Sequence, residues 1–344
     1  MRINKVRALI FFTSSVFLFF LITLIVTFGA GNPRASYLYS IDSYGIHKLD
    51  TSTDSEKIIL NTEGMYGVYF SVSPSDTIIA MLITKRGITP PGAHDYSVPP
   101  KNSLVFIDRD GNEIMTLDED VRKFSWSPDG EKIAYIKGTY YEGGVGFKTT
   151  GVGIFDLKDK SKTQIKKDFP HKTIRGFEGG GYEINWARHD SNVYIQDFGY
   201  LDGIYRYNTK IGKSEKVDYK GIDFSPDGKY YKEIEGIHIY LTATNEDITS
   251  QLIARFGPEW SRVSLNWVFN KGHCLHVIRK TAVQKAEFSW EYPVVHNVLY
   301  DVEEDRVVKE VTMPISRWVA GPDKLVFEED GKFVVWTYED VYGE

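Results

Sequence analysis

A few residues in the sequence are of the types that carry out acid-base, nucleophilic or metal chemistry. His189 and Asp190 are adjacent and resemble half of a catalytic pair, and His273 and His276 flank the single cysteine, Cys274. Side chains three residues apart in a strand point to opposite faces, so these two histidines are not expected to bind one metal. A lone cysteine in an apolar strand is more often a small core residue than a nucleophile. A multi-cysteine zinc or iron-sulfur site is excluded.

The sequence lacks the motifs of the common catalytic and cofactor-binding folds. It contains no Gly-x-Ser-x-Gly nucleophile elbow and no His-Glu-x-x-His zinc motif. Gly212, Lys213 and Ser214 resemble the end of a phosphate loop, but Tyr207 stands where that loop needs its first glycine. We therefore expect no catalytic residues, no metal and no cofactor, and an enzyme is the less favoured interpretation.

The composition indicates a folded chain rather than a disordered one. The 344 residues are 42% hydrophobic and 14% aromatic, which is enough apolar surface for a substantial core. The formal net charge is −6 although Arg2, Lys5 and Arg7 lie in the first seven residues, so the remainder is more acidic still. Because nucleic-acid binding requires a basic surface, we predict no nucleic-acid partner.

An uncharged apolar run occupies residues 8–30. A helix of this length rises about 34 Å, enough to cross a hydrocarbon core of roughly 30 Å. The basic residues precede the run, which predicts a cytoplasmic N-terminus. A cleaved signal peptide is the alternative, but its apolar region is usually about 7 to 15 residues long, and Phe28 fits a cleavage site poorly. We predict a short cytoplasmic tail at 1–7, a transmembrane signal-anchor at 8–30 and an extracytoplasmic domain at 31–344 of a single-pass cell-membrane protein.

After the apolar run, one strand-turn-strand unit recurs six times, at intervals of roughly 38 to 60 residues. Apolar residues alternate along its first strand, as in a half-buried β-strand, and the turn contains Pro, Asp and Gly. A second hairpin follows most copies, so each unit is expected to form four antiparallel strands. The copies are FSVSPSDTIIAML from Phe70, FSWSPDGEKIAYI from Phe124, INWARHDSNVYI from Ile184, IDFSPDGKYYKEI from Ile222, LNWVFNKGHCLHVI from Leu265 and WVAGPDKLVFEE from Trp318.

These copies resemble the TolB-type, WD-repeat-like propeller family, whose hallmark is an apolar strand followed by Ser-Pro-Asp-Gly and a second strand. The motif is strict at Ser127 and Ser225, nearly complete at Ser73 and eroded in the other copies. The resemblance implies an all-β fold, a β-propeller of four-stranded antiparallel blades. The periplasmic protein that gives the family its name has an α/β domain before its propeller; this sequence shows no counterpart, so that protein's partners are not carried over.

The number of blades depends on how the two ends of the chain are counted. Residues 37–73 and 321–344 together supply about one repeat, which favours six blades closed by both ends. Counting the strands at each end separately favours seven.

The long insertions between strands all fall in connections that a propeller places on one face. They are residues 84–103, 137–151, 168–183, 252–262 and 279–293. Long connections on a rigid scaffold commonly carry function. These are rich in aromatic residues, and the predicted ligand-binding residues are Tyr140, Tyr141, Trp260, Trp290 and Tyr292. The alternative is that the aromatic residues pack as lids over a small core.

The favoured function is therefore a membrane-anchored binding or scaffold module for a protein partner or an envelope polysaccharide. The alternative is an enzyme, because some TolB-like propellers resemble polysaccharide lyases that hold a metal and acid-base residues at the mouth of the ring. For that alternative the candidates are His94, His171, Glu178 and Glu183.

The anchor gives the first testable prediction. The full-length protein should keep its N-terminus and stay in the membrane fraction after carbonate extraction, because residues 8–30 are not removed. N-terminal sequencing of the membrane pellet checks this. A soluble mature chain that begins near Gly31 would overturn the prediction.

Overall fold

In the part of the chain that it describes, the computed structural model shows β-strands and two short helices. It describes residues 37–41, 45–50, 53, 55–62, 66–85, 101–140, 147–166, 182–197, 203–233, 238–256, 263–269, 271–286, 289–313, 324–329 and 332–343. The segments expected at 1–7 and 8–30 lie outside these ranges. Within the described ranges, no helix is long and apolar enough to cross a membrane.

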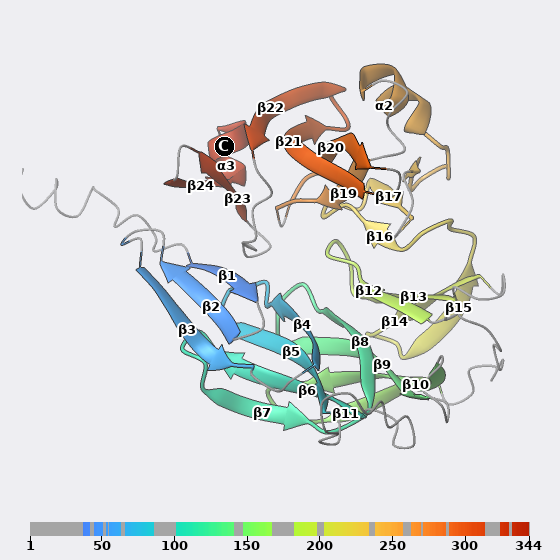
Figure 1. Cartoon of the computed structure of the whole chain (residues 1–344). Coiled ribbons are helices and arrows are strands. Elements are labelled where there is room, and N and C mark those ends of the chain that lie inside the picture. Colours follow the sequence, from blue (N-terminus) through green and yellow to red (C-terminus); the bar gives the residue numbers. More distant parts are fainter. Residues whose placement is uncertain are drawn as a thin grey trace, which may run out of the picture.

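Five consecutive stretches of chain each form one antiparallel sheet, and the sheets stand around a common centre as blades one to five (Figure 1). The strands of each blade follow one another in chain order. Blade one consists of β4 (Tyr66–Val72), β5 (Ile78–Lys85), β6 (Lys101–Asp108) and β7 (Glu113–Leu117), and blade two of β8 (Val121–Trp126), β9 (Lys132–Tyr140), β10 (Phe147–Asp156) and β11 (Lys162–Lys166). Blade three consists of β12 (Tyr182–Trp186), β13 (Asn192–Asp197), β14 (Ile204–Asn208) and β15 (Lys213–Val217), and blade four of β16 (Asp223–Phe224), β17 (Tyr230–Lys232) and β18 (Ile239–Leu241). Blade five consists of β19 (Val263–Trp267), β20 (Cys274–Ala286), β21 (Ser289–Asp301) and β22 (Arg306–Met313).

Both ends of the chain fill the remaining sector of the ring, so a six-blade propeller is supported (Figure 1). The described strands form two separate sheets there: β1 (Tyr37–Ile41), β2 (Gly45–Asp50) and β3 (Ser55–Asn61) in one, β23 (Lys324–Glu329) and β24 (Lys332–Thr337) in the other, followed by helix α3 (Tyr338–Tyr342).

The two end sheets pack on opposite neighbours. The first packs on blade one through Tyr39 and Ile46, and the second packs on blade five through Leu325 and Trp336. If each sheet is taken as an incomplete blade, the count becomes seven, the number that strand counting favoured.

The Ser-Pro-Asp-Gly turn closes the first hairpin of a blade through its own hydrogen bonds. In blade two, Ser127 Oγ donates to Asp129 Oδ1 at 2.5 Å and accepts from the Lys132 backbone N–H at 2.8 Å. Gly130 has φ +74°, which a glycine adopts without strain. Ser225 makes the equivalent contacts in blade four. The motif is thus a self-contained turn, which explains its recurrence.

The hydrophobic core lies between neighbouring blades. Phe124 and Trp126 of β8 are buried against Leu104 and Phe106 of blade one, and the rings of Phe106 and Trp126 meet edge to face with centroids 6.2 Å apart. Each blade therefore depends on the next for burial of its apolar face.

Hydrogen bonds also join the innermost strand of each of the first five blades to that of its neighbour, and we call these bonds the inner-strand belt. They are Trp126 Nε1 to Ser71 O at 3.3 Å, the Trp186 backbone N–H to Ser125 Oγ at 2.9 Å, Asn185 Nδ2 to Ile222 O at 2.7 Å, and Trp267 Nε1 to Asp223 O at 2.9 Å.

Blade four departs from the expected four strands. After β18, the chain makes only an isolated bridge between Tyr240 and Asp247 and then enters helix α2 (Thr249–Phe256). The Asp247 carboxylate accepts a hydrogen bond from the backbone N–H of Thr249 at 2.8 Å, an arrangement that favours the start of a helix over a further strand. Leu252 of the helix is then buried in the core beside blade five.

The packing of the inner-strand tryptophans predicts large losses of stability. Replacing Trp126 or Trp267 by Ala removes a buried ring and a belt hydrogen bond, and should lower the free energy of unfolding by roughly 3 to 5 kcal/mol. Chemical denaturation of the two variants and of the unsubstituted protein measures this difference. Unchanged denaturation midpoints for both would contradict the inter-blade packing.

Candidate functional site

The two faces of the ring differ in the kind of segment that joins the strands there. The turns within the first and last hairpins of each blade are short and lie on one face, which we call the turn face. The second strand of each blade ends, and the third begins, on the opposite face, which we call the connection face. Most residues of the predicted long insertions, including 86–100, 141–146 and 168–181, lie outside the described ranges.

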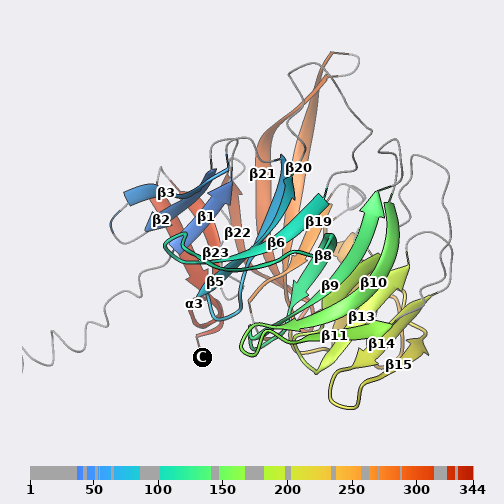
Figure 2. The ribbon, with the colours of Figure 1, turned by 90° about the horizontal axis from the view of Figure 1, so that it is seen from below.

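Strands β20 and β21 project from the connection face well beyond the rest of blade five (Figure 2). Each has 13 residues, whereas β19 has five and β22 has eight. Strand β19 pairs with β20 only over 275–279, and β22 pairs with β21 only over 295–301. Residues 280–286 and 289–294 therefore pair only with each other among the described strands, and we call this two-stranded projection the arm.

The arm has a strand structure that the sequence did not predict, because 279–293 reads as one long insertion. Its ladder shifts register between Thr281 and Val283 and again between Gln284 and Ala286. Such bulges, together with Pro293 in β21, disrupt the regular edges of the arm. An isolated two-stranded hairpin is only marginally stable in water, so an arm of this kind gains stability when a partner covers it.

The structure describes three of the five predicted ligand-binding residues, in two strands. Trp290 and Tyr292 lie in β21, on the arm, and Tyr140 is the last residue of β9. Tyr141 and Trp260 lie outside the described residues. The arm thus brings together two of the five predicted residues, both on the connection face.

Of the residues named for a lyase, the structure describes one. Glu183, in β12, forms an ion pair with Lys123 of blade two, whereas His94, His171 and Glu178 lie outside the described residues. Among the residues that the structure describes, no group of three or more His, Cys, Asp or Glu side chains has a metal-binding arrangement.

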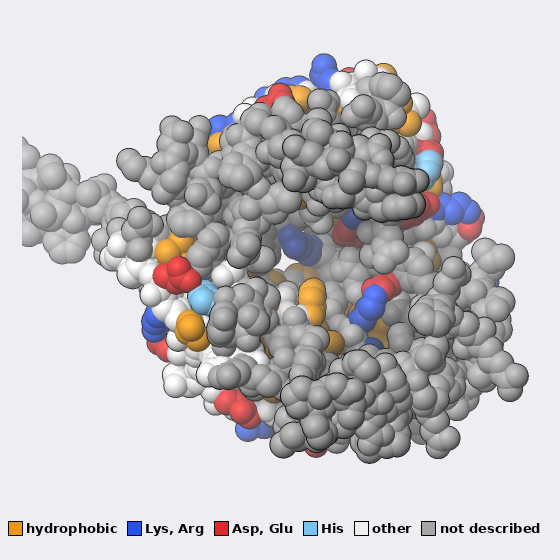
Figure 3. Space-filling model, in the orientation of Figure 1, with side chains coloured by type: hydrophobic (Ala, Val, Ile, Leu, Met, Phe, Trp, Pro, Cys, Tyr) orange, Lys and Arg blue, Asp and Glu red, His pale blue; other side chains and the backbone are white. Residues whose placement is uncertain are grey.

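Figure 3 shows a central hollow from the side of the connection face, with basic, acidic and hydrophobic side chains on its wall. Tyr69, on the inner strand of blade one, is 57% exposed, and its ring centroid lies 5.5 Å from that of Phe124. Desolvation by the surrounding protein raises the pKa of Tyr69 above its ordinary value.

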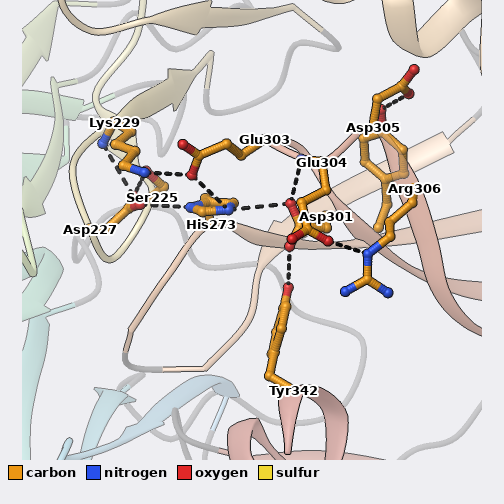
Figure 4. A network of polar contacts seen from close by, with 11 residues as sticks. Ser225, Asp227, Lys229, His273, Asp301, Glu303, Glu304, Asp305, Arg306 and Tyr342 are labelled. Carbon is orange, nitrogen blue, oxygen red and sulfur yellow. Dashed lines mark hydrogen bonds and ion pairs between the residues drawn. The ribbon is translucent and has the colours of Figure 1, made fainter. Parts of the chain in front are cut away.

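A polar network on the turn face was missed by sequence reasoning (Figure 4). His273, in the first turn of blade five, stands between carboxylates of two blades. Its Nδ1 lies 2.7 Å from Asp227 Oδ2 of blade four, and its Nε2 lies 3.3 Å from both Asp301 Oδ1 and Glu303 Oε2. Tyr342 of α3 donates to Asp301 at 3.0 Å, so the end of the chain joins the same network.

The charges of this network favour a protonated histidine. The hydrogen bond with Asp227 raises the pKa of His273 above its ordinary value, against the opposing effect of burial. Burial pushes the pKa of Asp227 upward, but its hydrogen bonds with His273 and Ser225 outweigh that effect and hold the pKa below the ordinary range. The network therefore acts as an electrostatic bridge between blades four and five.

The sequence contained a signal for this network. Asp227 belongs to a Ser-Pro-Asp-Gly turn, and Asp301 and Glu303 belong to the last turn of the next blade; both turn classes lie on one face. Considering His273 only as a metal ligand with His276 left this juxtaposition unnoticed.

Comparison with known proteins finds relatives in structure only. No family model matches the chain, and no curated protein matches it in sequence. Among solved structures, TolB from Acinetobacter baumannii is 13% identical over 83% of this chain, with a TM-score of 0.46, and the match spans 65% of that protein's length. An oligogalacturonate lyase in complex with manganese is also 13% identical, over 85% of this chain and 81% of its own, with a TM-score of 0.47. A putative TolB from Agrobacterium tumefaciens is 12% identical over 81% of this chain and 77% of its own, with a TM-score of 0.35. The structures similar to this chain thus include TolB-like propellers.

The His273 network predicts a specific pH dependence of stability. A raised folded-state pKa means that the folded protein binds the proton more tightly, so the stabilisation is complete below the unfolded value of about 6.5. It is lost as the pH rises through the raised folded-state pKa. Melting temperatures of the protein and of His273→Gln, measured from pH 5 to pH 9, should therefore converge toward high pH.

His276 provides a control of opposite sign. Burial lowers its pKa, so its contribution is present above about pH 6.5 and is lost as the pH falls. The His276→Gln variant should thus alter the acid side of the profile. If the His273→Gln curve runs parallel to that of the unsubstituted protein throughout, the histidine is not a charged bridge.

Proposed function

We propose that the chain is a membrane-anchored, extracytoplasmic binding module that engages a protein partner through its connection face, with the arm as the principal contact. The proposal places the anchor at residues 8–30 and the propeller outside the cytoplasm. The observation that carries it is the arm itself, 13-residue strands paired only with each other beyond the body of blade five.

The physical argument concerns unpaired backbone groups. Along 280–286 and 289–294, the outer edge of each strand presents N–H and C=O groups that no described strand satisfies. Such edges are recognised by proteins that add a strand, and aromatic residues such as Trp290 and Tyr292 are frequent anchors at protein interfaces. The bulges and Pro293 limit pairing with arbitrary chains, which favours a specific partner.

The scaffold suits this role because it is rigid where the arm is rooted. Residues 274–279 of β20 are held between β19 and β21, and Leu275 and Val277 are buried in the core of blade five. An envelope polysaccharide, the other partner expected from the sequence, is a distinct outcome of the experiment below.

The test places a photo-crosslinking amino acid at position 290 of the full-length protein in native membranes. We expect a discrete protein adduct from this position and none from position 271, which lies on the turn face, where Lys271 contacts Glu339 and the ring of Tyr338. Adducts that form only at position 271, or that contain polysaccharide and no protein, would overturn the proposal.

A quantitative prediction follows for the identified partner. Trp290→Ala should weaken its binding about 30-fold, the factor that corresponds to loss of a hot spot of about 2 kcal/mol. The melting temperature should stay nearly unchanged, because the arm lies beyond the packed part of blade five. Binding titrations and melting curves measure both effects, with Lys271→Ala as the matched control. A Trp290→Ala protein that melts as early as Trp126→Ala would identify Trp290 as a core residue.

A further inference from the structure

The first strand of the propeller begins on the turn face. Strands β2 and β3 are joined by a short turn, and Lys48 and Lys57, on either side of that turn, lie 3.4 and 3.3 Å from the carboxylate of Asp110. Asp110 belongs to the last turn of blade one, which lies on the turn face. Because Tyr37 of β1 pairs with Asp50, the last residue of β2, β1 begins on the same face.

The predicted anchor leaves little chain between the membrane and this point. The anchor ends at residue 30, so six residues, 31–36, separate it from Tyr37. Six fully extended residues span at most about 22 Å. If residues 8–30 cross the membrane, as the proposed function requires, the start of β1 stays within that distance of the end of the anchor. The turn face is therefore the face of the ring nearer to the attachment point.

Basic side chains gather in one sector of the turn face. The last turn of blade two carries Lys158 and Lys160, and Lys210 and Lys213 lie in or beside the last turn of blade three. All four are exposed, and no carboxylate of the described residues pairs with them. The two turns are neighbours, because Thr163 of β11 and Lys210 line one cleft. We call these four residues the lysine cluster.

The lysine cluster keeps its positive charge in a chain that is acidic as a whole. Of the two carboxylates in the last turn of blade two, Asp156 pairs with Lys132, which leaves Asp159 as the one acid among the four lysines. The last turn of blade five is the opposite case, since 301–306 contains four acids and one arginine. The basic charge is thus particular to the sector of blades two and three.

An exposed apolar side chain stands beside the lysine cluster. Ile211, in the last turn of blade three, is 65% exposed, more than any other large hydrophobic residue that the structure describes. The turn is held in shape by Asn208 Oδ1, which accepts from the backbone N–H of Lys210 at 3.0 Å and of Ile211 at 3.2 Å. An apolar side chain flanked by lysines suits a membrane surface, where it enters the headgroup layer while the ammonium groups stay at the phosphates.

We propose that the turn face lies against the membrane, and that the lysine cluster together with Ile211 binds anionic phospholipid headgroups. The short tether selects the face, and the charge selects the sector that makes contact. Lysines near an anionic membrane surface attract lipid phosphates, and salt screens this attraction. The arm, on the opposite side of the ring, then points away from the membrane, where the proposed protein partner can reach it (Figure 2).

The test uses the full-length protein in lipid nanodiscs with a fluorescent probe on an introduced cysteine. The single native cysteine, Cys274, is buried, which raises the pKa of its thiol to about 12 and keeps it unreactive. The probe is attached at Ile211→Cys and, as the connection-face control, at Asp118→Cys. Asp118 is exposed and accepts from Ser103 Oγ near the start of β6. Lipids with a nitroxide on the headgroup quench a probe that is close to the membrane surface.

In discs rich in phosphatidylglycerol, quenching at position 211 should exceed quenching at position 118 at least about threefold, because only the turn face meets the headgroups. In discs of phosphatidylcholine alone, or in high salt, quenching at position 211 should fall at least about twofold, because the attraction is electrostatic.

Substitution of the lysine cluster separates its role from that of the tether. Replacing its four lysines by Gln should lower quenching at position 211 at least about twofold in the anionic discs. The melting temperature should stay unchanged, because the four side chains are exposed and unpaired. The control is the double variant Lys229→Gln, Lys271→Gln, which removes turn-face lysines that pair with Glu303 and Glu339 and should leave the quenching unchanged.

Failure of this inference is distinguishable from failure of the proposed function. A protein that stays in the discs overturns the lipid contact alone if it is quenched equally at positions 211 and 118, quenched equally in neutral and anionic discs, or unaffected by the four-lysine substitution. A full-length chain that does not insert into the discs overturns the anchor, and with it the tether on which the orientation rests.

Discussion

The structure depends on the contact between the inner strand of one blade and that of the next. No single blade buries its own apolar face, because the residues that alternate along β8, β12 and β19 pack against the preceding blade. The inner-strand belt adds directional hydrogen bonds to this burial, such as that from Trp267 to the Asp223 carbonyl. Burial supplies most of the stability and the belt fixes the register between blades, since a buried donor left without its carbonyl is costly.

That constraint explains which parts of the repeat vary. The inner strands keep alternating apolar residues in every described copy, because any polar substitution would face the next blade. The turns and connections are free to change, and each change in the structure is local. Blade four replaces its last strand with the start of α2, and blade three replaces a serine and a glycine of its first turn with Ala187 and Asp190.

The two faces of the ring differ in the structural features that they present. On the connection face, the arm extends backbone edges away from the body, and this supports the proposed engagement of a partner. On the turn face, side chains from neighbouring blades meet within hydrogen-bonding distance. His273 there is surrounded by carboxylates of blades four and five. Short turns place side chains accurately because their backbones are fixed by their own hydrogen bonds.

The sequence by itself determined the repeat, the alternation of its inner strands and the turn chemistry, because strand period and Pro-Asp-Gly turns are local properties of the chain. From them followed the propeller and the four-stranded blades of most units. Only the tertiary structure decided that 279–286 and 289–293 form paired strands, since their residues carry no clear alternation. It alone brought Asp227 beside His273, because that contact depends on how one blade is set against the next. Such distances arise from packing between segments far apart in the chain, and no local pattern encodes them.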